Sequence, residues 1–394
     1  MFKNNRPLLI VSLIAIVNAL GYGIIIPIQF SYAARFGLSN FQNGLLFSLF
    51  SLCQFLSSPV IGNFSDRFGR RPLLILSLAG TVLSFLTMAF APSAIFLFIA
   101  RALDGLTAGN VPVAMSVISD TVEPKDRAKG FGIIGAAFGF GFVFGPAISA
   151  LTVGINPSLP FIIAAVITFI SVVITWFMLP ETNQHIGQVN QRKLFDFPKL
   201  AKSIVDENVG STLMVGLIYA LAFGLLIYAY NPFAKSVLGL SDTVIALNFV
   251  IFGIVGLVAQ GFLIPQLTKR IADKKLMIQA LIISVVGFFG VFIAHSYLFF
   301  VITSIFISLS NSFVQPLIAS LLSKEVDFKS QGEIMGINQS YASIGTIFGP
   351  IIGGLMASVF SVASPFLGGA LLSLVCVYVG YQIFKKPEKV VSLE

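Results

Sequence analysis

The chain reads GFGIIGAAFGFGFVFGPAISALTVGINPSLPFIIAAVITFISVVITWFMLP over residues 130–180, a run of 51 residues without Asp, Glu, Lys or Arg. A helix that crosses a membrane needs about 20 predominantly apolar residues. The run is therefore long enough for two crossings, and the stretch NPSLP at residues 156–160 is typical of a turn between them. We predict two membrane-spanning helices here, joined by a short loop.

Similar charge-free runs fill the rest of the chain. Two of them hold two crossings each, at residues 276–323 and 334–384. Five hold one crossing each, at residues 7–34, 36–65, 72–100, 208–234 and 243–268. A twelfth crossing, residues 94–119, is apolar except for Arg101 and Asp104. The prediction is an all-α integral membrane protein with twelve transmembrane helices.

The composition excludes several classes of protein. Of the 394 residues, 56% are hydrophobic and only 10% are charged, whereas about 25% are charged in a typical soluble domain. Soluble enzymes, secreted disulfide scaffolds and disordered tails do not fit. Cys53 and Cys376 lie inside separate predicted crossings, and His185 and His295 have no metal-ligand spacing. We therefore expect no metal site and no cofactor.

The basic residues indicate how the chain lies in the membrane. Of the 24 Lys and Arg residues, 21 fall in loops on the same side as both termini; Arg35 and Lys235 lie opposite, and Arg101 lies within a helix. By the positive-inside rule, both termini are cytoplasmic, and we expect a bacterial inner membrane. The net charge of +8 then reflects topology and lipid headgroups rather than a nucleic-acid partner.

The polar segment 181–208 divides the chain into two halves. We predict a six-helix bundle at 1–180, a cytoplasmic linker at 181–208 with a short surface helix around residues 198–205, and a second bundle at 209–394. A shift of 204 residues superimposes Pro112 on Pro316 and aligns residues 66–71 with residues 270–275. Two parallel six-helix repeats, related by pseudo-two-fold symmetry, are typical of a transporter that rocks its halves about a midplane site.

The loop after the second predicted helix carries the most specific signal, GNFSDRFGRRPLL at residues 62–74. It resembles motif A of the major facilitator superfamily, G-x-x-x-D-R-x-G-R-[KR]. Gly62 permits close approach of helices, Gly69 permits a tight turn, and Asp66 with Arg70 can form charge-assisted hydrogen bonds. Arg67 and Arg71 complete the match.

The resemblance implies a conformational latch. In the family that it resembles, this loop acts as a latch that stabilises the outward-facing state. Asp66 would then meet the start of the eleventh helix near residues 331–333, where a helix dipole favours an anion. Arg70 would pair with Asp120 at the end of the fourth helix.

The fourth predicted helix contains RALDGLTAG at residues 101–109, which is similar to motif B, R-x-x-x-G-x-x-x-G. A charge deep in a membrane helix costs about 2.5 to 3.5 kcal/mol on insertion scales and should face the interior. Asp104 lies three residues after Arg101 and can pair with it. The pair either couples transport to protons, as the resemblance implies, or neutralises itself and only packs the bundle.

Two further stretches resemble motif C, G-x8-G-x3-G-P, the antiporter motif of drug exporters. Its small residues and prolines would let a helix pack closely and bend at the interface between the halves. The residues are Gly132, Gly141, Gly145 and Pro146 in the fifth helix, and Gly336, Gly345, Gly349 and Pro350 in the eleventh. With GYGIIIPIQF at residues 21–30 and LPET at 179–182, the chain resembles the twelve-helix drug:proton antiporter branch, which includes tetracycline-type exporters.

Polar residues within crossings should face a central cavity, because a lipid-facing amide has no partner. Besides the charged pair, the substrate candidates are Asn18, Tyr22, Gln54, Asn110, Tyr219, Tyr228, Asn248, Asn311, Gln315, Asn338, Gln339 and Tyr341. The further mid-span acids expected of a tetracycline exporter do not occur in the first, third and ninth helices. This leaves Asp104 as the leading proton carrier.

The first interpretation is a proton-coupled exporter of lipophilic drugs or related small molecules, acting as a monomer by alternating access. A second keeps the fold and changes the cargo to a sugar, amino acid or metabolite. A third is a non-transporting receptor or a membrane enzyme. The sequence contains no Ser-His-Asp, paired-carboxylate, Cys-His or phosphate-loop arrangement, so we expect a transporter and not an enzyme.

Overall fold

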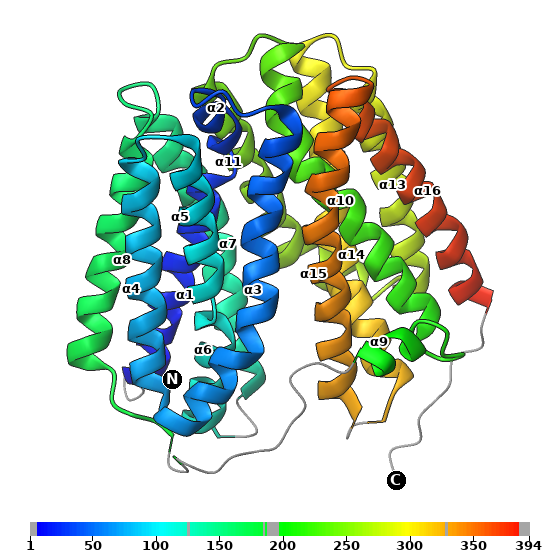
Figure 1. Ribbon diagram of the computed structural model, residues 1–394. Coiled ribbons are helices and arrows are strands. Elements are labelled where there is room, and N and C mark those ends of the chain that lie inside the picture. The colour runs from blue at the N-terminus through cyan, green and yellow to red at the C-terminus, as the bar shows by residue number, and fades with distance from the viewer. Residues whose placement is uncertain (1–5, 124–126, 184–185, 187–196, 328–329, 386–394) are drawn as a thin grey trace. The chain divides into compact units, whose positions relative to one another are not determined.

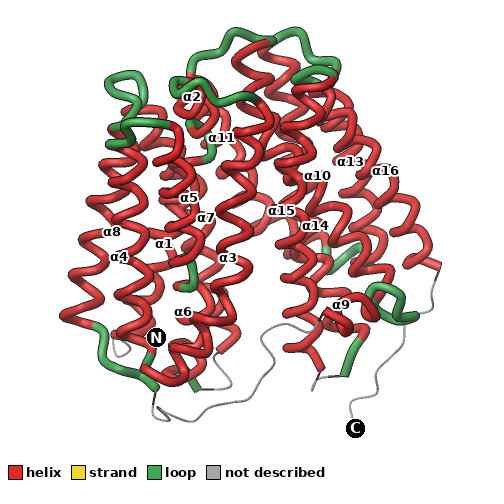
Figure 2. Tube along the Cα trace, viewed as in Figure 1, coloured by secondary structure: helices red, strands yellow, loops and turns green. Residues whose placement is uncertain are grey.

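The structure is a computed structural model that describes residues 6–123, 127–183, 186, 197–327 and 330–385 (Figures 1 and 2). His185 and the predicted linker residues 184 and 187–196 lie outside this range. The described residues form helices, turns and loops without a strand. Twelve of the described helical segments are long and apolar enough to cross a membrane, which confirms the predicted fold class.

The first six crossings are built from eight helices. These are α1 (Arg6–Ile25), α2 (Gln29–Ala34), α3 (Asn40–Phe68), α4 (Arg70–Ala89), α5 (Ala94–Thr107), α6 (Asn110–Thr121), α7 (Arg127–Thr152) and α8 (Leu159–Met178). The charge-free segments between the loops form these helices because only helices satisfy their own backbone within lipid. Figure 1 shows α4 and α8 running side by side.

Two of these crossings are broken, which differs from the prediction of one helix each. The first crossing turns between α1 and α2 at Pro27, whose ring removes a backbone donor. The fourth crossing breaks between α5 and α6 at Ala108 and Gly109. The break places Arg101 and Asp104 in a helix of 14 residues rather than in a continuous span.

The other six crossings follow a short helix, α9 (Phe197–Ser203), which overlaps the predicted surface helix. They are α10 (Gly210–Ser236); α11 (Asp242–Val258), continued by the π-helical turn η3 (Ala259–Leu263) and α12 (Ile264–Leu267); α13 (Asp273–Phe292); α14 (Tyr297–Glu325); α15 (Gln331–Val359); and α16 (Ser364–Lys385).

Contacts between Cα atoms divide the chain into two compact units. The first unit comprises residues 1–38, 49–194 and 240–253, and the second comprises 39–48, 195–239 and 254–394. By this division, residues 40–48 of α3 belong to the second unit and residues 242–253 of α11 belong to the first, and the two predicted halves stay a prediction. In the first unit, Ser31 of α2 donates a hydrogen bond to Asp242, the first residue of α11, at 2.5 Å.

Each unit has an apolar core and an apolar outer surface. The core of the first unit joins α1, α4, α6 and α7, and that of the second joins α10, α13, α14, α15 and α16. Large apolar side chains also cover the outside; Phe177 of α8 is 80% exposed and Leu151 of α7 is 76% exposed. Helices that are apolar on every side suit a lipid environment.

Glycines of the predicted seam motif pack inside each unit. A Cβ on Gly141 of α7 would lie 2.3 Å from the Cβ of Ala19 on α1, and one on Gly345 of α15 would lie 2.4 Å from that of Ala220 on α10. Gly145 and Gly349 are equally tight against α1 and α10. These four glycines therefore pack helices of the same bundle together, and a role of the motif at the interface between the halves stays a prediction.

Candidate functional site

The predicted latch loop is a one-residue joint between two helices. Helix α3 ends at Phe68 and α4 begins at Arg70, so that Gly69 alone connects them. The φ angle of Gly69 is +102°, a backbone conformation that residues with a Cβ rarely adopt. This glycine turns the chain sharply and places Asp66 and Arg70 on either side of the bend.

Arg70 is the centre of a hydrogen-bond network at this joint. Its side chain donates to Asp66, to Ser65 Oγ at 2.7 Å and, through Nε, to Asp120 Oδ2 at 3.0 Å. The residue is 8% exposed, which strengthens its ion pairs relative to pairs in water. Arg70 thereby ties the end of α3 to the end of α6.

The chain that follows α8 also joins this network. Two backbone N–H groups of α4, those of Arg70 and Arg71, donate to the two carboxylate oxygens of Glu181 at 2.8 and 3.1 Å. Asn183 donates from its side chain to the carbonyl of Asp66 at 2.9 Å. The hydroxyl of Thr182 donates to Asp120 Oδ2 at 3.5 Å. Residues 181–183 therefore hold the joint between α3 and α4 through hydrogen bonds.

The other latch arginines have different surroundings. Arg71 donates from its side chain to the carbonyl of Trp176 on α8. Arg67 is exposed, and its guanidinium carbon lies 5.1 Å from the ring centre of Phe68. A Cβ on Gly62 would meet no described heavy atom within 4 Å, so the close helix approach expected at Gly62 does not occur among the described residues.

The charged pair of the fourth crossing is buried inside the first unit. Arg101 Nη1 donates to Asp104 Oδ2 at 3.1 Å, and the two residues are 2% and 7% exposed. Neither side chain faces lipid. The Nε of Arg101 has no hydrogen-bond partner among the described residues. A buried charge that retains an unsatisfied donor lowers the stability of the fold. This cost favours a functional role for the pair over a role in packing alone.

Aromatic rings surround the Arg101 side of this pair. The guanidinium carbon lies 4.3 Å from the ring centre of Phe50 on α3, a cation–π contact. The ring of Tyr22 on α1 lies 5.9 Å from Phe50 and 6.2 Å from Phe142. Gly105, one turn after Arg101, lets α5 approach the backbone of α3 at Phe50. Gly105 therefore places Arg101 beside an aromatic wall formed by Tyr22, Phe50 and Phe142.

Two amide candidates of the first unit also meet. Asn110 at the start of α6 donates to Asn18 of α1 at 3.4 Å. Asn110 is 1% exposed, and its side-chain oxygen lacks a partner among the described residues. Gln54 on α3 is partly buried, and Asn248, which belongs to this unit, is 1% exposed.

The candidates of the second unit do not gather at one point. Tyr219 of α10 is hydrogen-bonded through its hydroxyl to Ser310 of α14 at 3.2 Å. Tyr228 is fully buried, and its hydroxyl has no partner among the described residues. Asn311, Gln315 and Asn338 are partly buried, whereas Gln339 is exposed.

Tyr341, another substrate candidate, contacts the short helix α9. It is 4% exposed, and its hydroxyl donates to the carbonyl of Leu200 in α9. The side chain therefore fastens the short linker helix to α15. This was not predictable from the sequence, because a polar residue within a crossing is equally consistent with a cavity wall.

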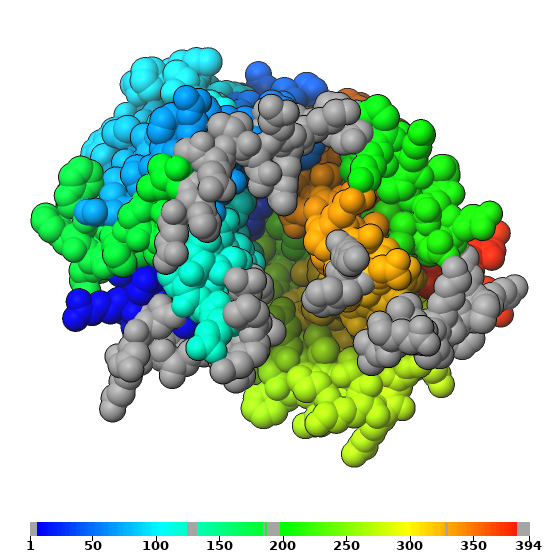
Figure 3. Space-filling view, turned by 90° about the horizontal axis from the view of Figure 1, so that it is seen from below, coloured from blue at the N-terminus to red at the C-terminus, as the bar shows by residue number. Residues whose placement is uncertain are grey.

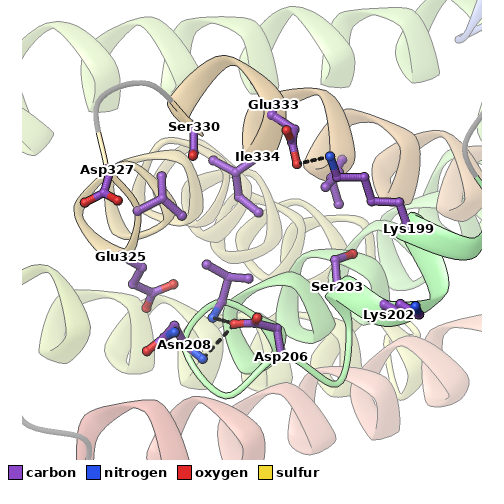
Figure 4. Close-up of a pocket in the computed structure, with 13 residues that line it drawn as sticks. Lys199, Lys202, Ser203, Asp206, Asn208, Glu325, Asp327, Ser330, Glu333 and Ile334 are labelled. Atoms are coloured by element: carbon purple, nitrogen blue, oxygen red, sulfur yellow. Dashed lines mark hydrogen bonds and ion pairs between the residues drawn. The ribbon is translucent and has the colours of Figure 1, made fainter. Parts of the chain in front are cut away.

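A cavity of about 510 Å³ lies beside α9 in the second unit (Figure 4). It is lined by Lys199, Lys202 and Ser203 of α9 and by groups from the end of α14 and the start of α15. Lys199 Nζ lies 2.5 Å from Glu333 Oε1 across its edge. From below, the start of α15, in orange, lies at the surface of this unit (Figure 3). Among the described residues, acids, histidines and cysteines form no group suited to a metal ion.

Sequence reasoning missed the role of residues 181–183 in the latch. LPET at residues 179–182 supports the family resemblance but predicts no contact with the latch, although an acid that directly follows a helix-ending proline is a usable signal. Ser65 and Ser310 were also missed. Serines are common in these helices, and nothing in their spacing marks them.

Comparisons with known proteins cover nearly the whole chain. A family model described as Major Facilitator Superfamily matches residues 11–229 and 212–393. The class C tetracycline resistance protein of Escherichia coli is 30% identical over 386 residues, which cover 95% of this chain and 96% of that protein. Multidrug resistance protein 2 of Bacillus subtilis is 28% identical and covers 91% of this chain and 90% of the relative.

The fold is also similar to that of solved transporters. A bacterial homolog to the human lysosomal transporter Spinster superimposes with a TM-score of 0.78 at 16% identity, covering 96% of each chain. With twelve apolar helices and a family match over nearly its whole length, the chain is a multi-pass membrane protein that belongs to the major facilitator superfamily.

Proposed function

We propose that the protein is a proton-coupled exporter of lipophilic drugs or related small molecules. Its relatives are named for tetracycline and multidrug resistance and match over nearly the whole chain. It would act as a monomer in a bacterial inner membrane, and the basic loops support a cytoplasmic position of both termini. The cargo is a small molecule, and the proton gradient supplies the energy.

The observation that carries this proposal is the buried Arg101–Asp104 pair. No other Asp or Glu lies in the middle of a predicted crossing. A proton that binds Asp104 neutralises its carboxylate and leaves Arg101 as a buried cation without a counter-ion. Such a state is costly, and it therefore favours a conformation in which water or cargo reaches Arg101.

The same chemistry suits the proposed cargo. When Asp104 is protonated, Arg101 remains against Phe50, near Tyr22 and Phe142. Planar aromatic molecules can stack on such rings. Asn18 and Asn110 supply hydrogen-bonding groups from α1 and α6. The proton and the cargo thus act on neighbouring groups, where they can compete, and antiport requires that the two bind in alternation.

The latch sets the conformational part of the cycle. We assign Asp66 to contact with the start of α15 in the outward-facing state, where the N-terminal helix dipole favours an anion. Arg70 holds Asp66 in place through their ion pair, and Asp120 fixes Arg70 in turn. Protonation at Asp104 shifts the balance between states, and the latch contacts stabilise the outward-facing state as it forms, so that they set the rate of entry into it.

The experiment is ethidium uptake into inverted membrane vesicles that carry an acid-inside gradient. The protein should concentrate the dye, and Asp104→Asn should abolish gradient-driven uptake. The same variant should still exchange labelled for unlabelled ethidium without a gradient, because the fold and the cargo contacts remain. Undiminished gradient-driven uptake in Asp104→Asn would remove Asp104 from the coupling mechanism.

A further inference from the structure

The carboxylate of Glu181 occupies the N-terminus of α4. It accepts the backbone N–H groups of Arg70 and Arg71, and its Oε1 also accepts those of Thr182 and Asn183 at 2.9 Å each. The first N–H groups of a helix have no partner within the helix and carry a partial positive charge. Glu181 supplies both the acceptors and the negative charge, although it belongs to the segment after α8.

Gly69 leaves the space that this carboxylate fills. A Cβ at Gly69 would lie 2.3 Å from Glu181 Oε2 and 2.8 Å from its Cδ. The glycine therefore meets two requirements, one for a positive φ angle and one for room for the Glu181 carboxylate in its observed position. The second requirement is specific to a carboxylate that arrives from outside the helix.

In the second bundle, bases stand at the positions of the acids of this network, while Arg70 corresponds to another base, Lys274. The 204-residue shift aligns Asp66 with Arg270, Asp120 with Lys324 and Glu181 with Lys385, so that each acid corresponds to a base. It aligns Gly69 with an acid, Asp273. Asp273 is the first residue of α13, and its carboxylate accepts from Lys324 Nζ at 2.6 Å and from Ser320 Oγ at 2.7 Å.

The helix dipoles affect the ion pairs of the two bundles in opposite ways. In the second bundle, an anion lies at the start of α13 and a cation at the end of α14, so both helix dipoles favour the Asp273–Lys324 pair. In the first bundle, the cation Arg70 lies at the start of α4 and the anion Asp120 at the end of α6, against both dipoles. The dipoles therefore weaken the Arg70–Asp120 pair, and besides Asp66, which already pairs with Arg70, an anion at the start of α4 would stabilise it.

We propose that Glu181 is that anion and acts as a positioning residue of the latch. Like Asp273 at the start of α13, it places a negative charge at the start of α4, but it comes from a separate segment and can withdraw, whereas Asp273 is part of its own helix. The joint between α3 and α4 can therefore change between conformations. The Asp273–Lys324 contact of the second bundle stays in place. This inference rests on the latch function proposed above for Asp66 and Arg70.

The test measures entry into the outward-facing state by single-molecule fluorescence energy transfer in the full-length protein in liposomes. Dyes are attached at Ile155→Cys and Phe360→Cys, both 77% exposed and in loops remote from the latch, in a Cys53→Ala, Cys376→Ala background. Glu181→Gln should slow entry about fivefold, the size expected for losing one favourable charge at a helix end. Glu207→Gln, an equal loss of charge at an exposed linker residue, is the matched control and should have no effect.

The decisive comparison repeats Glu181→Gln in an Asp66→Asn background. A positioning role predicts no further slowing there, because the latch is already lost, whereas a purely structural cap would slow both backgrounds equally and would overturn the inference. Glu181→Asp keeps the charge and should fall between wild type and Glu181→Gln, which covers the case in which the latter folds poorly. If Glu181→Gln entered the outward-facing state at the wild-type rate while Asp66→Asn entered it slowly, only the role of Glu181 would be refuted. Normal entry in Asp66→Asn would instead remove the latch itself and this inference with it.

Discussion

At the scale of single residues, the glycines of one motif have opposite surroundings. A Cβ at Gly141 would overlap Ala19 of α1, whereas one at Gly132 would meet no described atom within 4 Å. Gly141→Ala should therefore lower the free energy of unfolding by about 1 to 3 kcal/mol through overpacking. Gly132→Ala should raise it by about 0.5 to 1 kcal/mol, because alanine favours the helix. Thermal unfolding in detergent measures both, and equal effects would contradict the α1–α7 packing.

The buried ion pair makes a second prediction at this scale. Arg101→Gln leaves Asp104 without its cation and should cost about 3 to 5 kcal/mol of stability. Adding Asp104→Asn removes the uncompensated charge, so the double variant should be more stable than Arg101→Gln alone. Thermal unfolding at neutral pH distinguishes the two, and simple additivity would show that the side chains do not act as a pair.

Residue spacing predicted which side chains of one helix pair with each other, but it did not predict which other helices pack against them. Asp104 follows Arg101 by three residues, and a pair at that spacing needs only a helix. Tyr341 and Gly62 show the limit, because their contacts depend on which helix packs against them. Nothing in the local sequence indicates that α9 folds back onto Tyr341 or that the space beside Gly62 is open.

At the scale of elements, the docking of α9 depends on a few contacts. Tyr341→Phe removes the hydrogen bond to the Leu200 carbonyl, a loss of about 1 kcal/mol. Hydrogen–deuterium exchange in α9 should then become about fivefold faster. Tyr378→Phe is the matched control, because Tyr378 is 68% exposed on α16. Unchanged exchange in Tyr341→Phe would mean that other contacts hold the helix.

The twelve crossings were predictable because charge-free runs and bilayer thickness determine their number and approximate ends. The breaks within the first and fourth crossings were not. Pro27 and the Ala108–Gly109 step fall inside apolar runs, and hydropathy does not distinguish a bent crossing from a straight one. The linker helix was found near its predicted place because prolines and basic residues mark it as a surface segment.

At the scale of the whole molecule, the latch should control the rate of the cycle and not the binding of cargo. Asp66→Asn should slow conformational exchange while leaving ethidium affinity unchanged, because the residue lies at the end of α3 and not beside the aromatic wall. Fluorescence energy transfer gives the rate, and ethidium fluorescence titration gives the affinity. Equal turnover in the variant and the wild type would count against the latch.

The measurement that tests proton-coupled export most directly is ethidium transport by the purified protein in liposomes with an imposed pH gradient. We expect the dye to accumulate on the acidic side, to leave when an ionophore dissipates the gradient, and to drive protons the opposite way when a dye gradient is imposed alone. Dye movement at the same rate with and without the gradient, and without proton movement, would contradict coupling through the Arg101–Asp104 pair.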